Sequence, residues 1–142
     1  KKAKQGLRGD LNEEYIKRFP IIENIINQIT TFDDCLWLAV AKVSPKTGNI
    51  SRHSDKGIDK MNAGIQIGKT ARIHYVMKTN PETHFQLQDL RGKTHKYYMK
   101  QGEYWYMDKR KPHAVYNKGD TFRYHMIFDM KVTEDLWDHL NL

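Results

Sequence analysis

The chain has 142 residues, of which 39% are hydrophobic and 29% charged. This length gives room for one domain with a hydrophobic core but hardly for a second. No run of about 18 apolar residues is available to span a bilayer, and no apolar signal-peptide core follows Lys1. The single cysteine excludes an internal disulfide and a cysteine-rich zinc site. We therefore expect a soluble, cytoplasmic protein with one domain over residues 11–142, preceded by a basic, flexible arm over residues 1–10.

The formal net charge of +7 would favour an anionic partner such as nucleic acid, an acidic protein or a small polyanion. Part of this charge lies in the arm, at Lys1, Lys2, Lys4 and Arg8. Charged termini of this kind are usually solvated. The net charge therefore does not by itself indicate a binding site.

Between residues 11 and 29, apolar side chains recur every three or four positions. This spacing predicts two short helices, or one helix kinked at Pro20. Seven runs rich in aromatic and β-branched residues predict strands: CLWLAVAKV, ARIHYVMK, HFQLQDL, HKYYMK, EYWYMD, HAVYN and FRYHMIFDMKV. Turn-forming segments separate them, which favours an antiparallel sandwich or barrel. The closing TEDLWDHLNL predicts a helix with Thr133 as N-cap and Asp135 in its first turn.

Two histidines and a carboxylate are placed where a metal site could form. His53 and Asp55 are separated by one residue at the end of an expected strand, where alternate side chains point the same way. His113 opens a later strand directly after the turn DKRKP, which puts it near a barrel mouth. This is the donor set that non-haem iron(II) uses when other positions must stay open for an oxo-acid and dioxygen. We therefore predict that His53, Asp55 and His113 bind a metal ion.

Arg123 lies ten residues after His113 and shares a strand face with His125 and Asp129. An arginine that faces the inside of an apolar barrel needs an anionic partner, because an unpaired buried charge is very costly. The distal carboxylate of 2-oxoglutarate would be such a partner for the guanidinium fork. The alternative is an arginine paired with Asp120 or Asp129.

The chain resembles the aspartyl/asparaginyl β-hydroxylase family and the related small proline hydroxylases, which are iron(II)- and 2-oxoglutarate-dependent oxygenases. The resemblance covers residues 37–130 and is carried by RHSD, RIHYVMKTNP, GEYWYMD, PHAVYN and FRYHMIFD. It implies an all-β core folded as a double-stranded β-helix, a jelly roll of the cupin type. N-terminal helices and a short C-terminal helix would flank this core.

The resemblance also implies roles for individual residues. His53 and His113 would bind iron. Arg123 would bind 2-oxoglutarate, and Arg72 and His74 would line the co-substrate pocket. His84 and His125 are further pocket candidates that the resemblance does not assign. Arg72, His74, His84 and His125 are equally candidates for structural roles. Animal members of the family have glycine at the position of Asp55, so the chain is closer to the proline-hydroxylase pattern at the metal.

The implied reaction is hydroxylation of an unactivated carbon, with Pro, Asp or Asn as candidate target residues in a free amino acid, a peptide or a protein. It uses Fe(II), 2-oxoglutarate and O2, with ascorbate as a candidate reductant, and releases succinate and CO2. No catalytic group beyond the metal centre is expected. Two alternatives stay open: a cupin-like metal protein that uses His53, His74 and His113 without an oxo-acid, and a basic, non-catalytic module that binds nucleic acid. The sequence does not indicate the oligomeric state.

Overall fold

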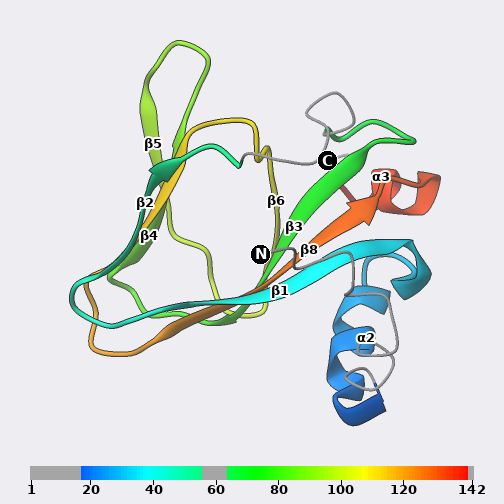
Figure 1. Ribbon diagram of the computed structural model, residues 1–142, viewed down its shortest axis with the longest axis horizontal. Helices are drawn as coiled ribbons and strands as arrows, with labels where there is room; N and C mark the ends of the chain where they lie inside the picture. Colours follow the sequence, from blue (N-terminus) through cyan, green and yellow to red (C-terminus); the bar gives the residue numbers. More distant parts are fainter. Residues whose placement is uncertain (1–16, 56–63, 141–142) are drawn as a thin grey trace, which may run out of the picture.

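The computed structural model describes residues 17–55 and 64–140. Within these ranges the chain forms eight strands in two antiparallel four-stranded sheets, with helices on one side (Figure 1). The strands are β1 (Cys35–Val43), β2 (Gly48–His53), β3 (Thr70–Lys78), β4 (Thr83–Gln88), β5 (Thr94–Tyr97), β6 (Tyr104–Met107), β7 (His113–Asn117) and β8 (Arg123–Lys131). The helices are α2 (Pro20–Asn27), the 3-10 turn η1 (Phe32–Asp34) and α3 (Glu134–Leu140). The expected arm lies outside the described residues.

The strand order is that of a jelly roll. The major sheet has the order β1-β8-β3-β6 and the minor sheet β2-β7-β4-β5. The first strand pairs with the last, the second with the seventh, the third with the sixth and the fourth with the fifth. A long hairpin wound into a barrel gives this pattern. The predicted fold class is therefore confirmed, and each of the seven predicted strand runs overlaps an observed strand, while β2 lies outside these runs.

Two apolar clusters use opposite faces of the major sheet. On its outer face, Ile26 of α2 and Leu136 of α3 pack with Ile73 and Phe128, and all four are fully buried. Because strand side chains alternate, the neighbours of Ile73 and Phe128 face the barrel interior. Those neighbours include Arg72 and His74 on β3. The inner face of the major sheet is therefore partly polar.

The second cluster lies inside the barrel and contains Val43, Val76, Phe85, Met107 and Val115. These residues come from both sheets. They close one part of the interior and leave the polar residues of β3 and β8 together beside it. The apolar cluster and the polar surface of the interior together define the space in which a ligand can bind.

Pro20 begins a helix and does not kink one. It occupies the first turn of α2, after Phe19, whose backbone is non-helical with φ −132. Proline suits this position because its fixed φ is helical and its missing N–H is not needed there. Of the two predicted alternatives, the structure shows a helix that starts at Pro20. Most of the expected helical segment before it lies outside the described residues.

Helix α3 agrees with its prediction in detail. The backbone N–H of Leu136 donates to Thr133 Oγ1 at 3.4 Å, and Glu134 and Asp135 occupy the first turn. Acidic residues in a first turn interact favourably with the helix dipole. None of the helices in residues 17–55 and 64–140 is long and apolar enough to cross a membrane.

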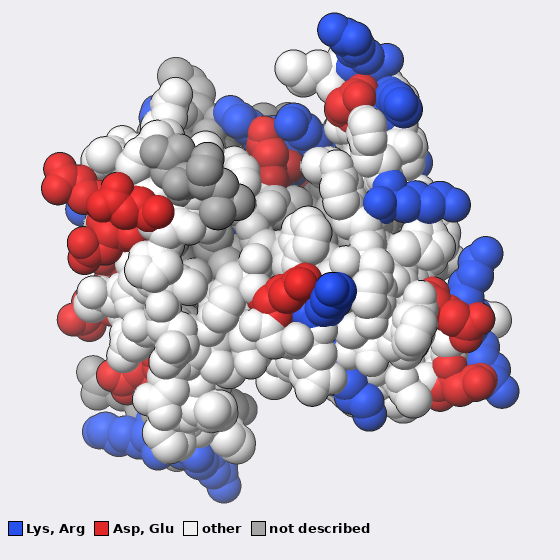
Figure 2. Space-filling model, turned by 180° about the vertical axis from the view of Figure 1, so that it is seen from behind, with Lys and Arg blue, Asp and Glu red and all other residues white. Residues whose placement is uncertain are grey.

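The surface seen from behind carries charges of both signs (Figure 2). On this face the charged side chains of the described residues lie in small groups, several of which contain both signs, mostly around the outline, with uncharged atoms over much of the centre. A protein that tracks a nucleic-acid backbone usually presents a continuous basic stripe. This face does not provide such a stripe.

Candidate metal centre

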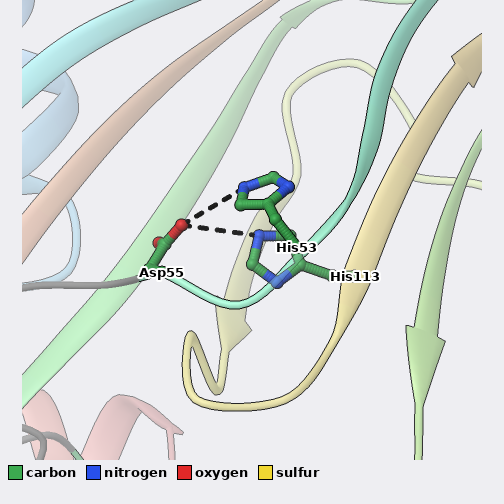
Figure 3. A group of neighbouring side chains, drawn as sticks. All are labelled: His53, Asp55 and His113. Atoms are coloured by element: carbon green, nitrogen blue, oxygen red, sulfur yellow. Dashed lines mark ion pairs between the residues drawn. The ribbon is translucent and has the colours of Figure 1, made fainter.

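The three predicted metal ligands converge at one end of the minor sheet (Figure 3). His53 ends β2 and His113 begins β7, and the two residues are paired in the strand register. Asp55 follows β2 and turns its carboxylate toward both rings, with Oδ1 at 3.3 Å from His53 Nε2 and 3.8 Å from His113 Nε2. The three donor atoms lie within 4.8 Å of one another.

Backbone carbonyls fix the tautomer of both histidines. His53 Nδ1 donates to the carbonyl of Ser51 at 2.7 Å, and His113 Nδ1 donates to the carbonyl of Lys111 at 2.9 Å. A carbonyl can only accept, so each Nδ1 carries the proton and each Nε2 keeps a lone pair. Both lone-pair nitrogens belong to the cluster with Asp55. The rings are therefore prepared to bind a cation, as metal-binding histidines usually are.

The surroundings of His113 favour its neutral form. Burial is the main cause that lowers the pKa of His113, and His53 and Arg72 add to it, against opposing effects of Asp55 and of the Lys111 carbonyl. Neutral imidazole is the form that binds metal. Donors about 2.1 Å from one ion and at right angles to each other lie roughly 3 Å apart. The observed separations and the chemistry of the donors therefore fit a divalent ion such as iron(II).

The candidate metal site opens into a cavity between the two sheets. This cavity, with its open mouth, encloses about 380 Å³ of empty space. Its polar lining consists of His53, Asp55, His113, Arg72, His74 and Arg123, and its apolar lining of Ile50, Phe85, Met107, Val115 and Ile127. The minor and major sheets therefore contribute different polar groups to one space.

Arg123 is a buried cation beside this cavity. It is 1% exposed, and burial lowers its pKa to about 9, so it stays charged at neutral pH. Its Nη2 donates to His125 Nδ1 at 2.7 Å, while its Nε has no hydrogen-bond partner among the described residues. No ion pair with Arg123 is found in the described part of the chain. A buried guanidinium with an unused donor provides a site for an anion.

The alternative partners proposed for Arg123 are occupied elsewhere. Asp120 lies on the surface, where its Oδ1 is 3.8 Å from Lys46 Nζ. Asp129 accepts hydrogen bonds from Arg72 and Lys109. Neither carboxylate neutralises Arg123, so its charge remains available to a ligand.

His74 and His125 form a buried pair next to Arg123. Their Nδ1 atoms are 3.4 Å apart, and each side chain is almost fully buried. Burial, followed by the charge of Arg123, lowers the pKa of both rings well below its ordinary value, so both are neutral. His74 Nε2 has no hydrogen-bond partner among the described residues. His74 therefore offers a second unused polar atom at the cavity.

The other two predicted pocket residues are placed differently. Arg72 lines the cavity, but its guanidinium is engaged with Asp55 and with Asp129. The rings of His84 and Tyr116 stack with their centroids 5.3 Å apart. Because the next residue, Phe85, faces the cavity, His84 lies on the outer face of the minor sheet. The structure thus brings Arg123, His125, His74 and Arg72 together near the candidate metal site but does not bring His84 there.

Two residues of the site were not foreseen. Lys109 is 5% exposed and Asp129 is 2% exposed, and Lys109 Nζ lies 3.2 Å from Asp129 Oδ2. In the sequence, Lys109 belongs to the turn-like segment DKRKP, in which a lysine is expected to be solvated. Asp129 was considered only as an alternative partner for Arg123. Their pairing with each other is a tertiary contact that has no local signal.

Comparisons with known proteins bear on the family and the fold of the chain. The chain matches the sequence profile of a family described as Aspartyl/Asparaginyl beta-hydroxylase over residues 6–132. No curated protein matches it. Among solved structures, the non-heme monooxygenase ThoJ in complex with nickel is 15% identical, with a TM-score of 0.51 over 82% of this chain and 51% of that one.

Two further solved structures resemble the chain with lower TM-scores. A prolyl-4-hydroxylase from Pseudomonas putida is 14% identical, with a TM-score of 0.47 over 89% of this chain and 69% of that one. A cupin domain from Bordetella pertussis Tohama I is 16% identical, with a TM-score of 0.42 over 66% and 81%. At such identities a structural likeness bears on the fold alone.

Proposed function

The chain belongs to the aspartyl/asparaginyl β-hydroxylase family, and from this we propose that it is an iron(II)- and 2-oxoglutarate-dependent dioxygenase. Its substrate would be an unactivated carbon of an amino acid or of a protein residue, with Pro, Asp and Asn as candidates. The observation that carries the proposal is the buried, charged Arg123, which has no counter-anion in the described residues and borders the same cavity as the metal centre. A metal site and an anion site side by side are what an oxo-acid oxygenase requires.

His53, Asp55 and His113 would hold the iron. When bound, iron and 2-oxoglutarate supply the oxidising chemistry by which O2 hydroxylates the substrate, with succinate and CO2 as further products. The hydrogen bonds from the two Nδ1 atoms to backbone carbonyls hold the imidazoles in a fixed orientation. Asp55 contributes the negative charge that two neutral imidazoles lack.

Arg123 would bind the distal carboxylate of 2-oxoglutarate. His125 already orients the guanidinium through its Nδ1, and the partnerless Nε remains available to the ligand. A charge-assisted hydrogen bond is stronger in a desolvated pocket than in water. The apolar side chains of Phe85, Val115 and Ile127 line the same cavity and limit the access of water.

The cupin-like alternative needs His74 as a metal ligand in place of the carboxylate. Within residues 17–55 and 64–140, the group of side chains that could share one ion contains Asp55 and not His74. His74 instead contacts the ring of His125, with their Nδ1 atoms 3.4 Å apart. The arrangement therefore favours the ligand set with Asp55.

The proposed reaction is tested before any substrate is known. Oxygenases of this kind are expected to convert 2-oxoglutarate to succinate slowly even when no substrate is present. Purified protein is therefore incubated with iron(II), ascorbate, O2 and 2-oxoglutarate, and the formation of succinate is followed by NMR. We expect iron-dependent succinate formation that stops when iron is omitted. Protein that binds iron and 2-oxoglutarate but forms no succinate would contradict the proposal.

Asp55→Gly tests the carboxylate ligand. We expect weaker iron binding and loss of most turnover, because the glycine variant leaves only the two histidines as ligands. Iron affinity is measured by anaerobic titration and turnover by succinate formation. Asp120→Gly, at an exposed turn, is the control for removing an aspartate charge. Near-full turnover of Asp55→Gly would show that Asp55 is not a ligand.

A further inference from the structure

A line of charged side chains leads from the metal centre into the protein. Arg72 donates to Asp129 through two nitrogens, with Nε to Oδ1 and Nη2 to Oδ2 both at 2.8 Å. Its remaining terminal nitrogen, Nη1, donates to Asp55 Oδ2. Lys109 Nζ adds a contact to Asp129 Oδ2 at 3.2 Å. Asp55 and Asp129 are thus bridged by one guanidinium.

The two carboxylate oxygens of Asp55 have separate partners. Oδ1 is the oxygen that faces His53 Nε2 and His113 Nε2. Oδ2 is the oxygen that receives Arg72. The arginine therefore leaves the metal-facing oxygen free and restrains rotation of the carboxylate about its last bond.

The backbone of Asp55 is held by the same group of residues. Its N–H donates to the carbonyl of Lys109 at 3.0 Å, so Lys109 contacts both Asp55 and Asp129. The Trp37 ring covers the Arg72 guanidinium, with its centroid 4.9 Å from Cζ. These contacts fix Arg72 in place from several sides.

The charges of the group balance. Asp55 and Asp129 are acidic, whereas Arg72 and Lys109 are basic. Without Asp129, the positive charge of Arg72 beside the metal-binding carboxylate would repel the metal ion. An unpaired buried charge at this position would also cost free energy of folding. Asp129, which is 2% exposed, offsets the charge of Arg72. The arrangement therefore provides orientation without a net positive charge next to the ion.

We propose that Arg72, Asp129 and Lys109 form a positioning network that fixes Asp55 as a metal ligand through one oxygen. Arg72 then acts on the metal through Asp55 and is not a ligand of 2-oxoglutarate, the role that the family resemblance suggested for it. The inference rests on the metal site of the proposed function but not on its co-substrate.

The main test is Arg72→Gln, which removes the bridge while keeping a polar side chain of moderate length. Loss of an outer hydrogen-bond partner of a metal ligand typically costs about 10- to 100-fold in metal affinity. We expect a decrease of that size in Co²⁺ affinity, measured by titration, together with a changed visible spectrum of the bound Co²⁺. The affinity for 2-oxoglutarate of Co²⁺-saturated protein should change little.

Two further variants separate positioning from a general structural role. Arg110→Gln is the matched control, because Arg110 also pairs with an aspartate through two nitrogens, at 2.8 and 2.9 Å to Asp108, but on the surface. It should bind Co²⁺ like the wild type. In an Asp55→Ala background, Arg72→Gln should cause no further loss of Co²⁺ affinity, because the residue through which it acts is gone.

Arg72→Lys keeps the charge but cannot bridge both carboxylates, so its Co²⁺ affinity should lie between those of the wild type and Arg72→Gln. Unchanged Co²⁺ affinity of Arg72→Gln with weakened binding of 2-oxoglutarate would overturn the inference and leave the proposed function standing. An equal loss of Co²⁺ affinity in the wild-type and Asp55→Ala backgrounds would also overturn it. A wild-type protein that binds no Co²⁺ would instead contradict the proposed metal site itself.

Discussion

His113→Ala is expected to lose most metal binding while the protein stays folded. The variant removes one of three ligands, so its affinity should fall by more than the roughly 10- to 100-fold that loss of an outer hydrogen-bond partner costs. The fold should survive because His113 begins a strand beside the open cavity and belongs to neither apolar cluster. Iron content is measured by elemental analysis and folding by circular dichroism.

His84→Ala is the control for this experiment. It also removes a histidine from the minor sheet, but from the outer face, where His84 stacks on Tyr116. Its iron content should match that of the wild type. Unchanged iron stoichiometry in His113→Ala would remove His113 from the site.

Arg123→Lys is expected to weaken 2-oxoglutarate binding by roughly ten- to a hundredfold, because losing a charge-assisted hydrogen bond costs about 1.5 to 3 kcal/mol. Lysine offers a point charge in place of a fork. The same burial that lowers the pKa of Arg123 to about 9 would also act on a lysine, whose ordinary pKa of about 10.4 is already lower. The substitution therefore removes the paired hydrogen bonds of the guanidinium and lowers the fraction of side chains that carry a positive charge.

The measurement is an anaerobic titration of 2-oxoglutarate into iron-loaded protein, followed by the visible charge-transfer band of a chelated keto-acid. Iron binding itself should hardly change, because Arg123 is not among the metal-site residues. Arg123→Ala should bind 2-oxoglutarate more weakly still, since it leaves the ligand carboxylate unpaired. Identical titrations of wild type and Arg123→Lys would show that Arg123 does not hold the co-substrate.

Strand positions could be predicted because they depend on local pattern. Alternation of apolar and polar residues and turn-forming segments are visible in any short stretch, and the observed strands follow them. The same local rule could have placed His84 correctly. Phe85 and Leu87 alternate as apolar residues in THFQLQ, so the inward face of this strand does not include His84.

The pairing of charged residues could not be predicted in this way. The contacts of Arg72 with Asp55 and Asp129 depend on which strands lie side by side and in which register. A single sequence contains no direct record of that register. The family resemblance gave roles to the motif residues, but it could not show that Arg72 is engaged by two carboxylates.

The pairing of the first strand with the last has a consequence for how the protein folds. Residues from Cys35 to Val43 meet residues from Met130 back to Arg123, so the barrel closes only when distant parts of the chain come together. Such non-local pairing makes folding slow, because the entropy of closing a long loop is lost before the contacts form.

His53 and His113 likewise meet only in the closed barrel. An ion that binds them stabilises the folded chain by mass action. An ion bound at this site would therefore raise the fraction of the protein that is folded.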